Sequence, residues 1–236
     1  MPKLALIVPG GVDPSGERRV IPALLALVKR LAARHDLHVF ALRQQAEPGA
    51  WMLHGARIRN IGAGWTRVRA VRAIWAEHRR EPFDAVQSIW SAACGLIAVT
   101  AGRALAIPSL VHVAGGEPVR LTDIGFGGRL TWRGRLQELV AMRGACIVTA
   151  ASAPLVSLLA GLGCAAERLP LGVDLGQWTP RAPVARNGAA ARLIHVASLN
   201  RVKDQPTLFA ALALLAEQGI AFELDVIGED TLDGRV

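Results

Sequence analysis

The chain has 236 residues, of which 52% are hydrophobic and 19% are charged, and its formal net charge is +8. This composition is typical of a globular α/β protein and excludes an intrinsically disordered chain. No apolar run reaches the roughly 18–20 uncharged residues that a membrane span needs. The apolar stretch Leu4 to Pro9 is followed by glycines and acidic residues, which makes it a poor signal peptide, so we expect a cytoplasmic protein.

The excess of basic residues suits an anionic ligand, such as nucleic acid, an acidic membrane surface or a phosphorylated substrate. A general preference for arginine explains the excess equally well. The sequence lacks the interleaved aromatic and basic residues of a nucleic-acid platform, and we expect no nucleic-acid partner. Cys94, Cys146 and Cys164 form no C-x-x-C pair and have apolar neighbours, which predicts buried free thiols and neither a disulfide framework nor a zinc site.

Short β patterns alternate with amphipathic helical patterns from the first residues, which predicts βαβ units and a parallel sheet. The strands expected in the first part of the chain are Leu4–Val8, Leu37–Leu42, Arg57–Ile61, Phe83–Gln87, Ser109–Val113 and Cys146–Ala150. The expected helices are about Glu17–Arg34, Thr66–Arg80, Ala92–Leu105, Leu130–Met142 and Ala153–Leu162. Pro22 is compatible with the first of them only if it lies in the first turn or marks a small break.

The helix expected from Thr66 to Arg80 is basic and amphipathic. Its predicted apolar stripe has helical spacing and consists of Val68, Val71, Ile74 and Trp75. The arginines that fall away from this stripe are Arg69, Arg72, Arg79 and Arg80. Such a face suits contact with an anionic surface, and a solvated helix face is the alternative.

The character of the sequence changes over residues 174–190, which contain two prolines, several glycines and little apolar periodicity. This composition is typical of a surface linker. The βα pattern then restarts with a strand at Arg192–Ala197, a helix at Asp204–Gln218 and a strand at Phe222–Ile227. Asp204 is the expected N-cap of that helix, with Pro206 in its first turn. We therefore expect a first domain at 1–173, a linker at 174–190 and the start of a second domain at 191–236.

The first loop, PGGVDPSGERR, lies between the first strand and the first helix, where backbone N–H groups can face a phosphate. It is not a P-loop, because Glu17 and Arg18 occupy the positions that require Lys and Ser or Thr. It also lacks the G-x-G-x-x-G fingerprint, which disfavours a dinucleotide-dependent oxidoreductase. A plain glycine turn is the alternative.

Two further places carry residues suited to chemistry. Arg201 and Lys203 lie between a strand and a helix, so two cations and a helix N-terminus outline a diphosphate site, with ordinary surface charges as the alternative. His112 precedes the turn VAGGE at the carboxyl end of a strand, where ligands bind in open α/β sheets. A core histidine with satisfied hydrogen bonds is the alternative there, and we interpret His38 and His195 as structural.

Together these segments resemble the family 4 glycosyltransferases, which are retaining enzymes of the GT-B fold that use nucleotide sugars. The resemblance covers nearly the whole chain. Residues 9–40 are similar to that family's glycine loop, first helix and second strand, and SLVHVAGG is similar to the strand that carries its active-site histidine. Residues 146–180 are similar to the segment that closes the first domain, and ASLNRVKDQPTLFAALALL is similar to the opening of the donor domain.

The resemblance implies a Rossmann-like, parallel-sheet N-terminal domain on the acceptor side and an incomplete second Rossmann-like domain for the donor. It implies that Gly10 and Gly11 approach the donor phosphates, that His112 lies at the reaction centre and that Lys203 binds the diphosphate. The family usually has an arginine five residues before that lysine. This sequence has Ser198 there, and Arg201 is the candidate substitute.

The implied reaction moves a hexosyl-type sugar from a nucleotide sugar to a hydroxyl group of a glycan or lipid-linked acceptor, with retention of configuration, in glycan, polysaccharide or glycolipid biosynthesis. The sequence contains no D-x-D pair, and we expect neither a metal ion nor a cofactor. One interpretation of the basic helix is that it brings the protein into peripheral contact with the inner membrane face.

In that family the second domain continues through further βα units that carry paired glutamates. We therefore expect a truncated chain, or a naturally shortened protein, that transfers sugar poorly. The alternative function is a non-catalytic sugar- or nucleotide-binding module.

Overall fold

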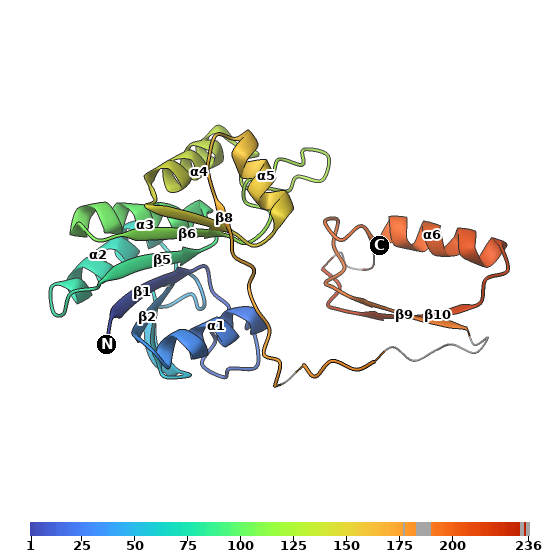
Figure 1. Ribbon diagram of the computed structural model, residues 1–236, viewed down its shortest axis with the longest axis horizontal. Helices are drawn as coiled ribbons and strands as arrows, with labels where there is room; N and C mark the ends of the chain where they lie inside the picture. The colour runs from blue at the N-terminus through green and yellow to red at the C-terminus, as the bar shows by residue number, and fades with distance from the viewer. Residues whose placement is uncertain (177, 183–189, 232–233, 235–236) are drawn as a thin grey trace. The chain divides into compact units, whose positions relative to one another are not determined.

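The computed structural model describes residues 1–176, 178–182, 190–231 and 234 (Figure 1). The chain divides into two compact units, Met1–Trp178 and Thr179–Val236. The expected linker at 174–190 falls partly on residues 177 and 183–189, which lie outside the described part of the chain. The domain boundaries drawn from the sequence therefore stay predictions.

The first unit is built on an eight-stranded sheet with the order β3-β4-β2-β1-β5-β6-β7-β8. All neighbouring strands are parallel except β3 and β4, which are antiparallel. The strands are β1 (Lys3–Val8), β2 (Asp36–Ala41), β3 (Gly49–Leu53), β4 (Ala56–Asn60), β5 (Ala85–Ile89), β6 (Ser109–Val113), β7 (Ile147–Ala150) and β8 (Glu167–Arg168). The predicted α/β class with a mostly parallel sheet is confirmed.

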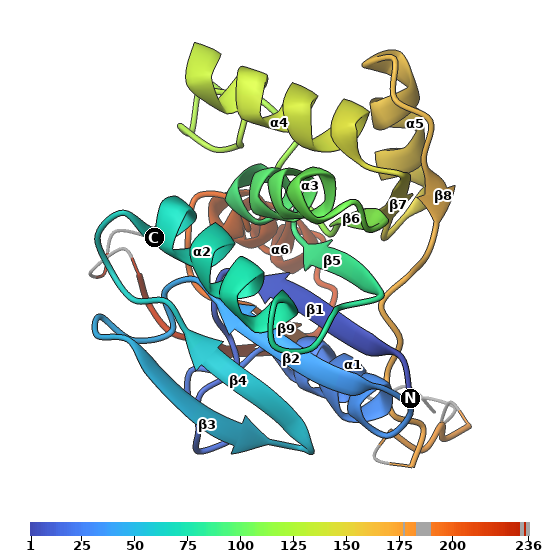
Figure 2. The same ribbon diagram turned by 90° about the vertical axis from the view of Figure 1, so that its left-hand side faces the viewer.

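Five helices are described in the first unit: α1 (Pro22–Ala32), α2 (Thr66–His78), α3 (Ala92–Leu105), α4 (Trp132–Gly144) and α5 (Ala153–Gly161). Helix α1 covers one face of the sheet, and α3 and α4 lie on the opposite face (Figures 1 and 2). The predicted start of α1 at Glu17 is wrong, because the helix begins at Pro22. Proline suits that first position, where its missing N–H costs no hydrogen bond.

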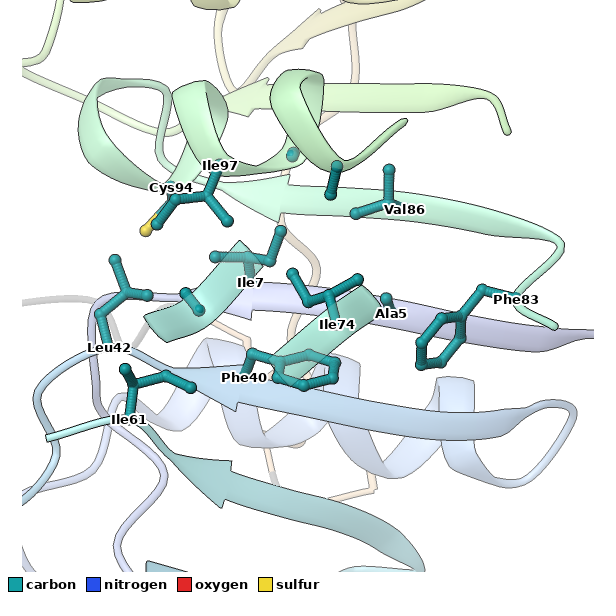
Figure 3. Close-up of a cluster of buried hydrophobic side chains, with 13 residues drawn as sticks. Ala5, Ile7, Phe40, Leu42, Ile61, Ile74, Phe83, Val86, Cys94 and Ile97 are labelled. Atoms are coloured by element: carbon teal, nitrogen blue, oxygen red, sulfur yellow. The ribbon is translucent and has the colours of Figure 1, made fainter. Parts of the chain in front are cut away.

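Alternating side chains of β1 divide the core between the two faces of the sheet. Ala5 and Ile7 pack with Ile74 of α2 and Ile97 of α3 (Figure 3). Leu6 and Val8 pack on the other face, in a cluster that includes Leu24, Leu25 and Val28 of α1. Burial on both faces explains why the central strands appear in the sequence as nearly continuous apolar runs.

Helix α2 is rotated relative to its predicted orientation. Val68 and Trp75, predicted to be buried, are 50% and 51% exposed. Thr66, Ala70 and Ile74 form the buried side of the helix instead. Ala70 is small and fully buried, so the helix backbone can approach the core closely along that side. Two apolar side chains therefore lie among arginines on the outer surface of α2.

The prediction of three buried thiols is also wrong at one position. Cys94 and Cys164 are buried and free, but Cys146 is exposed. Cys146 immediately precedes β7, and its N–H donates to Ser109 O at the amino edge of the sheet. Its position at a strand start explains the exposure that its apolar neighbours do not indicate.

The second unit contains the parallel strands β9 (Ala191–Val196) and β10 (Phe222–Ile227), joined through helix α6 (Gln205–Glu217). The helix covers one face of this pair (Figure 1). On the other face, Ile194, Val196 and Ile227 are exposed. Proline stands in the first turn of α6 and Asp204 stands at its N-cap position, both as predicted, but Asp204 has φ 50° and its side chain makes no capping hydrogen bond.

Candidate functional site

The glycine loop after β1 is held by a buried glutamine from the loop after β2. Gln44 Oε1 accepts hydrogen bonds from Gly11 N at 2.6 Å and Val12 N at 3.0 Å. Its amide nitrogen lies 3.3 Å from Asp13 Oδ2 and 3.2 Å from the carbonyl oxygen of Arg19, and donates to both. The loop is thus a fixed structure at the carboxyl edge of the sheet.

Gly10 and Gly11, predicted to approach a phosphate, both lie against Gln44. A Cβ atom on Gly10 would lie 3.2 Å from Gln44 Oε1. Gly11 has φ +83° and a Cβ atom there would lie 2.7 Å from the side chain of Ile21, so a substitution at this position would be strained. Because the Gly11 N–H is donated to Gln44, a phosphate that used this N–H would have to displace the glutamine. The phosphate role of both glycines stays a prediction.

A second buried amide supports Gln44. Asn60 ends β4, and its Oδ1 accepts from Gln44 N at 3.0 Å. Asn60 Nδ2 donates to Gln45 O at 3.0 Å, so one side chain closes the turn that follows β2. The sequence interpretation missed Gln44 and Asn60. The available signal was a polar side chain at or just after the end of a buried strand, where ligand sites of parallel sheets gather.

His112 is the fourth of the five residues of β6 and is 2% exposed. Its Nδ1 lies 2.9 Å from Thr149 Oγ1 on the neighbouring strand β7. Its Nε2 is buried and has no hydrogen-bond partner among the described residues. Burial lowers the pKa of His112, so the ring is neutral near pH 7.

His112 lines a cavity of about 200 Å³ in the first unit. Gln87 of β5 and Arg30 of α1 are the other polar residues that line it, and the remaining walls come from α1 and from the segment Leu169–Val173. Most of the lining residues are apolar, and neither Gly10 nor Gly11 is among them. The His112 side chain therefore lies on the α1 side of the sheet, within strand β6, and the turn that follows the strand does not line this cavity. Its place at a reaction centre stays a prediction.

The carboxylate of Glu117 organises the turn after β6. Glu117 is the last residue of the VAGGE turn, and the sequence alone indicated no role for it. Glu117 accepts hydrogen bonds from Ala114 N at 3.2 Å, Gly115 N at 2.7 Å and Ser91 N at 3.3 Å. Ser91 precedes helix α3, and its hydroxyl donates to Glu138 Oε2 of helix α4 at 2.7 Å. Burial raises the pKa of Glu138, and the charge of Glu117 raises it further. Two buried carboxyl groups thus join the ends of β5 and β6 to α4.

Arg201 and Lys203 lie together on one loop at the carboxyl edge of the second unit. Asn200 Oδ1 accepts from Val202 N at 3.1 Å and from Lys203 N at 3.2 Å, which folds the loop into a tight turn. Leu199 N donates to Glu229 O at 2.9 Å, which ties this loop to the one after β10. Both cationic side chains are exposed.

Gly228 allows the two loops of the second unit to approach. A Cβ atom at this position would lie 1.8 Å from the carbonyl oxygen of Ala197. Any larger residue would therefore push the loop after β10 away from the loop after β9. The sequence interpretation assigned no role to Gly228, although a glycine directly after a strand is a signal of close backbone approach.

Two kinds of site are not found in the part of the chain that the structure describes. No group of three or more His, Cys, Asp or Glu residues is placed to hold a metal ion there. Within the same residues, no helix is both long enough and apolar enough to cross a membrane.

Comparison with family models gives no match. A sequence relative is EpsF of Bacillus subtilis (strain 168), which its name assigns to the glycosyltransferases. It is 33% identical over 193 residues, which cover 72% of this chain and 46% of EpsF. The present chain therefore spans about half the length of that relative.

Two solved structures have a similar fold. HepE of Anabaena, in complex with UDP, has a TM-score of 0.62 at 13% identity, with 98% of this chain and 62% of HepE covered. The UDP-GlcNAc 2-epimerase of Methanocaldococcus jannaschii, in complex with UDP-GlcNAc and UDP, has a TM-score of 0.50 at 11% identity, with 95% of this chain and 66% of the epimerase covered. These likenesses bear out the predicted fold of GT-B type with Rossmann-like units.

Proposed function

We propose that the chain is the acceptor-side domain and the opening of the donor domain of a glycosyltransferase that uses a nucleoside-diphosphate sugar. The observation that carries the proposal is the 33% identity to EpsF over 193 residues. The cationic loop that bears Arg201 and Lys203 supports it, because this loop precedes helix α6 at the carboxyl edge of parallel strands. The solved structures of similar fold hold UDP, and we propose a uridine diphosphate sugar as the donor.

The proposed chemistry is the retaining transfer of family 4. Negative charge builds on the diphosphate as it leaves, so the protein has to stabilise that charge. Lys203 and Arg201 supply positive charge, and the N-terminus of α6 adds the partial positive charge of its free N–H groups. We propose that this set works without a metal ion, and that Arg201 serves in place of the arginine absent at Ser198.

The acceptor hydroxyl is proposed to bind to the first unit. His112 offers a neutral ring with a free Nε2 beside a mainly apolar cavity. An acceptor with an apolar part, such as a lipid-linked glycan, fits that lining best. Gly10 and Gly11 would approach the donor phosphates from the loop that Gln44 holds. We also propose a cytoplasmic site of action at an anionic membrane face, because arginines and the exposed Trp75 share the surface of α2 and the exposed Trp65 directly precedes the helix.

The test is donor binding and transfer with matched lysine variants. UDP-glucose and UDP-N-acetylglucosamine are titrated against the chain by calorimetry and incubated with glycan and lipid-linked acceptors. We expect Lys203→Ala to weaken donor binding by about 1.5–3 kcal/mol, which is roughly tenfold to a hundredfold. Lys29→Ala, at an exposed lysine of α1, is the control that should change nothing.

Each result of that test bears on the proposal. Equal donor affinity of the Lys203 and Lys29 variants would remove Lys203 from the site. Donor binding without transfer by a chain extended with further donor-domain sequence would favour a binding module over an enzyme. The absence of nucleotide-sugar binding in such an extended chain would overturn the proposal.

A further inference from the structure

Gln205 is the first residue of helix α6 and is fully buried, at 0% exposure, although Asp204 and Pro206 beside it are exposed. Its amide Nε2 lies 3.2 Å from the carbonyl oxygen of Ser198 and donates to it. The same nitrogen lies 3.2 Å from Nε2 of His195 on β9. One side chain therefore ties the start of α6 to β9 and to the loop that follows β9.

These contacts fix the hydrogen positions. A carbonyl oxygen only accepts hydrogen bonds, so the atom that faces Ser198 O has to be the amide nitrogen of Gln205. Because that nitrogen also faces His195 Nε2, the ring nitrogen has to accept. Nε2 of His195 therefore carries no proton, and the ring proton lies on Nδ1. This tautomer is an observable consequence of the arrangement.

The start of the cationic loop, defined here as Ser198–Asp204, is held by two sets of hydrogen bonds. On the side of β10, the N–H and the hydroxyl of Thr231 both donate to Leu199 O, at 3.2 and 2.8 Å. On the side of α6, the Gln205 side chain donates to Ser198 O and so joins the residue after the loop to the residue that begins it. Arg201 and Lys203 lie within the segment that this hydrogen bond closes.

The backbone between Lys203 and the helix is in an uncommon conformation. Asp204 has φ 50° and ψ 49°, a left-handed region that L-residues rarely adopt and that aspartate adopts only occasionally. Such a conformation persists when surrounding contacts determine it. The buried hydrogen bonds of Gln205, the next residue, are the contacts in a position to do so.

A purely space-filling role does not account for an amide at position 205. Gln205 Oε1 is buried and has no partner among the described residues, which is unfavourable and which leucine would avoid. The favourable part of the side chain is its nitrogen, which makes both contacts. The arrangement therefore favours a residue that orders the loop over one that only fills the interior.

We infer that Gln205 is a positioning residue that sets the direction of Arg201 and Lys203 toward a diphosphate group. This inference rests on the proposed function of the cationic loop. It does not place Gln205 against the ligand; the residue acts through Ser198, His195 and the backbone at Asp204.

The test uses the full chain, with inorganic pyrophosphate as the probe. Nitrogen-15 NMR of the wild type reports the tautomer of His195, and amide shifts of the cationic loop report pyrophosphate binding. In Gln205→Leu we expect the Nδ1–H preference of His195 to be lost and pyrophosphate affinity to fall about tenfold. Gln218→Leu, at the exposed far end of α6, is the matched control and should behave as wild type.

The outcomes separate this inference from the proposed function. If the wild type binds pyrophosphate and Gln205→Leu binds it equally, the inference is overturned and the proposed function stands. If the wild type binds none, the proposed role of the loop fails and so does the inferred role of Gln205, whatever the His195 tautomer. If Gln205→Leu does not fold, Gln205→Met keeps a similar side-chain length, has no donor for Ser198 O and adds no charge, and wild-type affinity in that variant contradicts the inference. An Nε2–H tautomer in the wild type also contradicts it.

Discussion

The hydroxyl of Ser91 donates a hydrogen bond of 2.7 Å to the carboxyl group of Glu138, and both residues are buried. The serine hydroxyl stabilises the charged carboxylate, but burial opposes it and is the larger influence on the pKa. The charge of Glu117, which accepts from the N–H of the same serine, opposes ionisation of Glu138 as well. The net effect is a raised pKa for Glu138.

Glu138→Gln should stabilise the protein near neutral pH. With a raised pKa, the folded state binds more protons than the unfolded state at pH values above the ordinary glutamate pKa of 4.5. The contribution of Glu138 to stability is therefore present below that pH and is lost as pH rises toward the folded pKa. Glutamine keeps an acceptor for Ser91 and does not ionise. Urea unfolding should be measured from pH 4.5 to 7.5. Over this range the free energy of unfolding of the variant should rise relative to that of the wild type, by about 1.4 kcal/mol for each unit by which the pKa is raised.

Glu47→Gln is the control, since Glu47 is exposed. Parallel pH profiles for wild type, Glu47→Gln and Glu138→Gln would show that the pKa of Glu138 is the same in the folded and unfolded states, contrary to this prediction.

One thiol should react in the native protein. Burial raises the pKa of Cys94 to about 12, and burial also raises the pKa of Cys164. The reactive species is the thiolate, so both thiols should be inert at pH 8, whereas Cys146 is exposed. Titration with a chromogenic disulfide should give one fast equivalent, absent in Cys146→Ser, and two more only after denaturation. Fast release of more than one equivalent by the native protein would contradict this.

The parallel sheet could be predicted because buried parallel strands leave nearly continuous apolar runs, as in β1 and β2. Strand β3 was missed because it is an antiparallel edge strand, and β8 because it has only two residues. Helix α2 was predicted with the wrong buried side, since periodicity alone does not distinguish Ala70 from Val68 as the core contact. In the candidate site, charge and position in the sequence indicated Lys203. Gln44 was missed because its role arises from a contact with Gly11, which is 33 residues away in the sequence. Gln205 was missed because its side chain turns back onto the loop that precedes it.

Gln44→Leu should loosen the glycine loop. The substitution leaves the N–H groups of Gly11 and Val12 without their acceptor, and burying unsatisfied groups costs about 1–3 kcal/mol each in mutational data. We expect a lower free energy of unfolding and faster hydrogen exchange at residues 11–19. Gln45→Leu is the comparison, because the neighbouring Gln45 is half-buried and contacts Asn60 through its backbone carbonyl, which the substitution keeps. Equal exchange in the two variants would show that Gln44 does not hold the loop.

The second unit should open more easily than the first. Leu212 is its only buried hydrophobic residue among those described, and α6 covers just one face of two strands. Two-stranded sheets are marginally stable, and local stability follows buried apolar contact. Native-state hydrogen exchange should show amides of β9, β10 and α6 at least tenfold less protected than those of β1 and β5. Equal protection in the two units would contradict this expectation.

The last prediction concerns the outer surface of α2. Trp65, Val68 and Trp75 are exposed there, and the guanidinium of Arg79 lies 5.5 Å from the ring centroid of Trp75. Aromatic and apolar side chains among arginines are typical of helices that lie in a membrane interface. We therefore expect the chain to sediment with vesicles that contain anionic lipid at low salt, and less so as salt screens the charges.

Two pairs of variants can separate the contribution of the α2 arginines to vesicle binding from the contribution of the net positive charge of the chain. Each basic residue near an anionic leaflet contributes about 1 kcal/mol, so replacing Arg72 and Arg79 with glutamine should weaken vesicle binding by roughly thirtyfold. Replacing the exposed Arg18 and Arg34 with glutamine removes the same charge from other surfaces and should have little effect. If both pairs weaken binding equally, the attraction is a property of the net charge. If the chain does not bind anionic vesicles at all, the acceptor is better sought among soluble glycans.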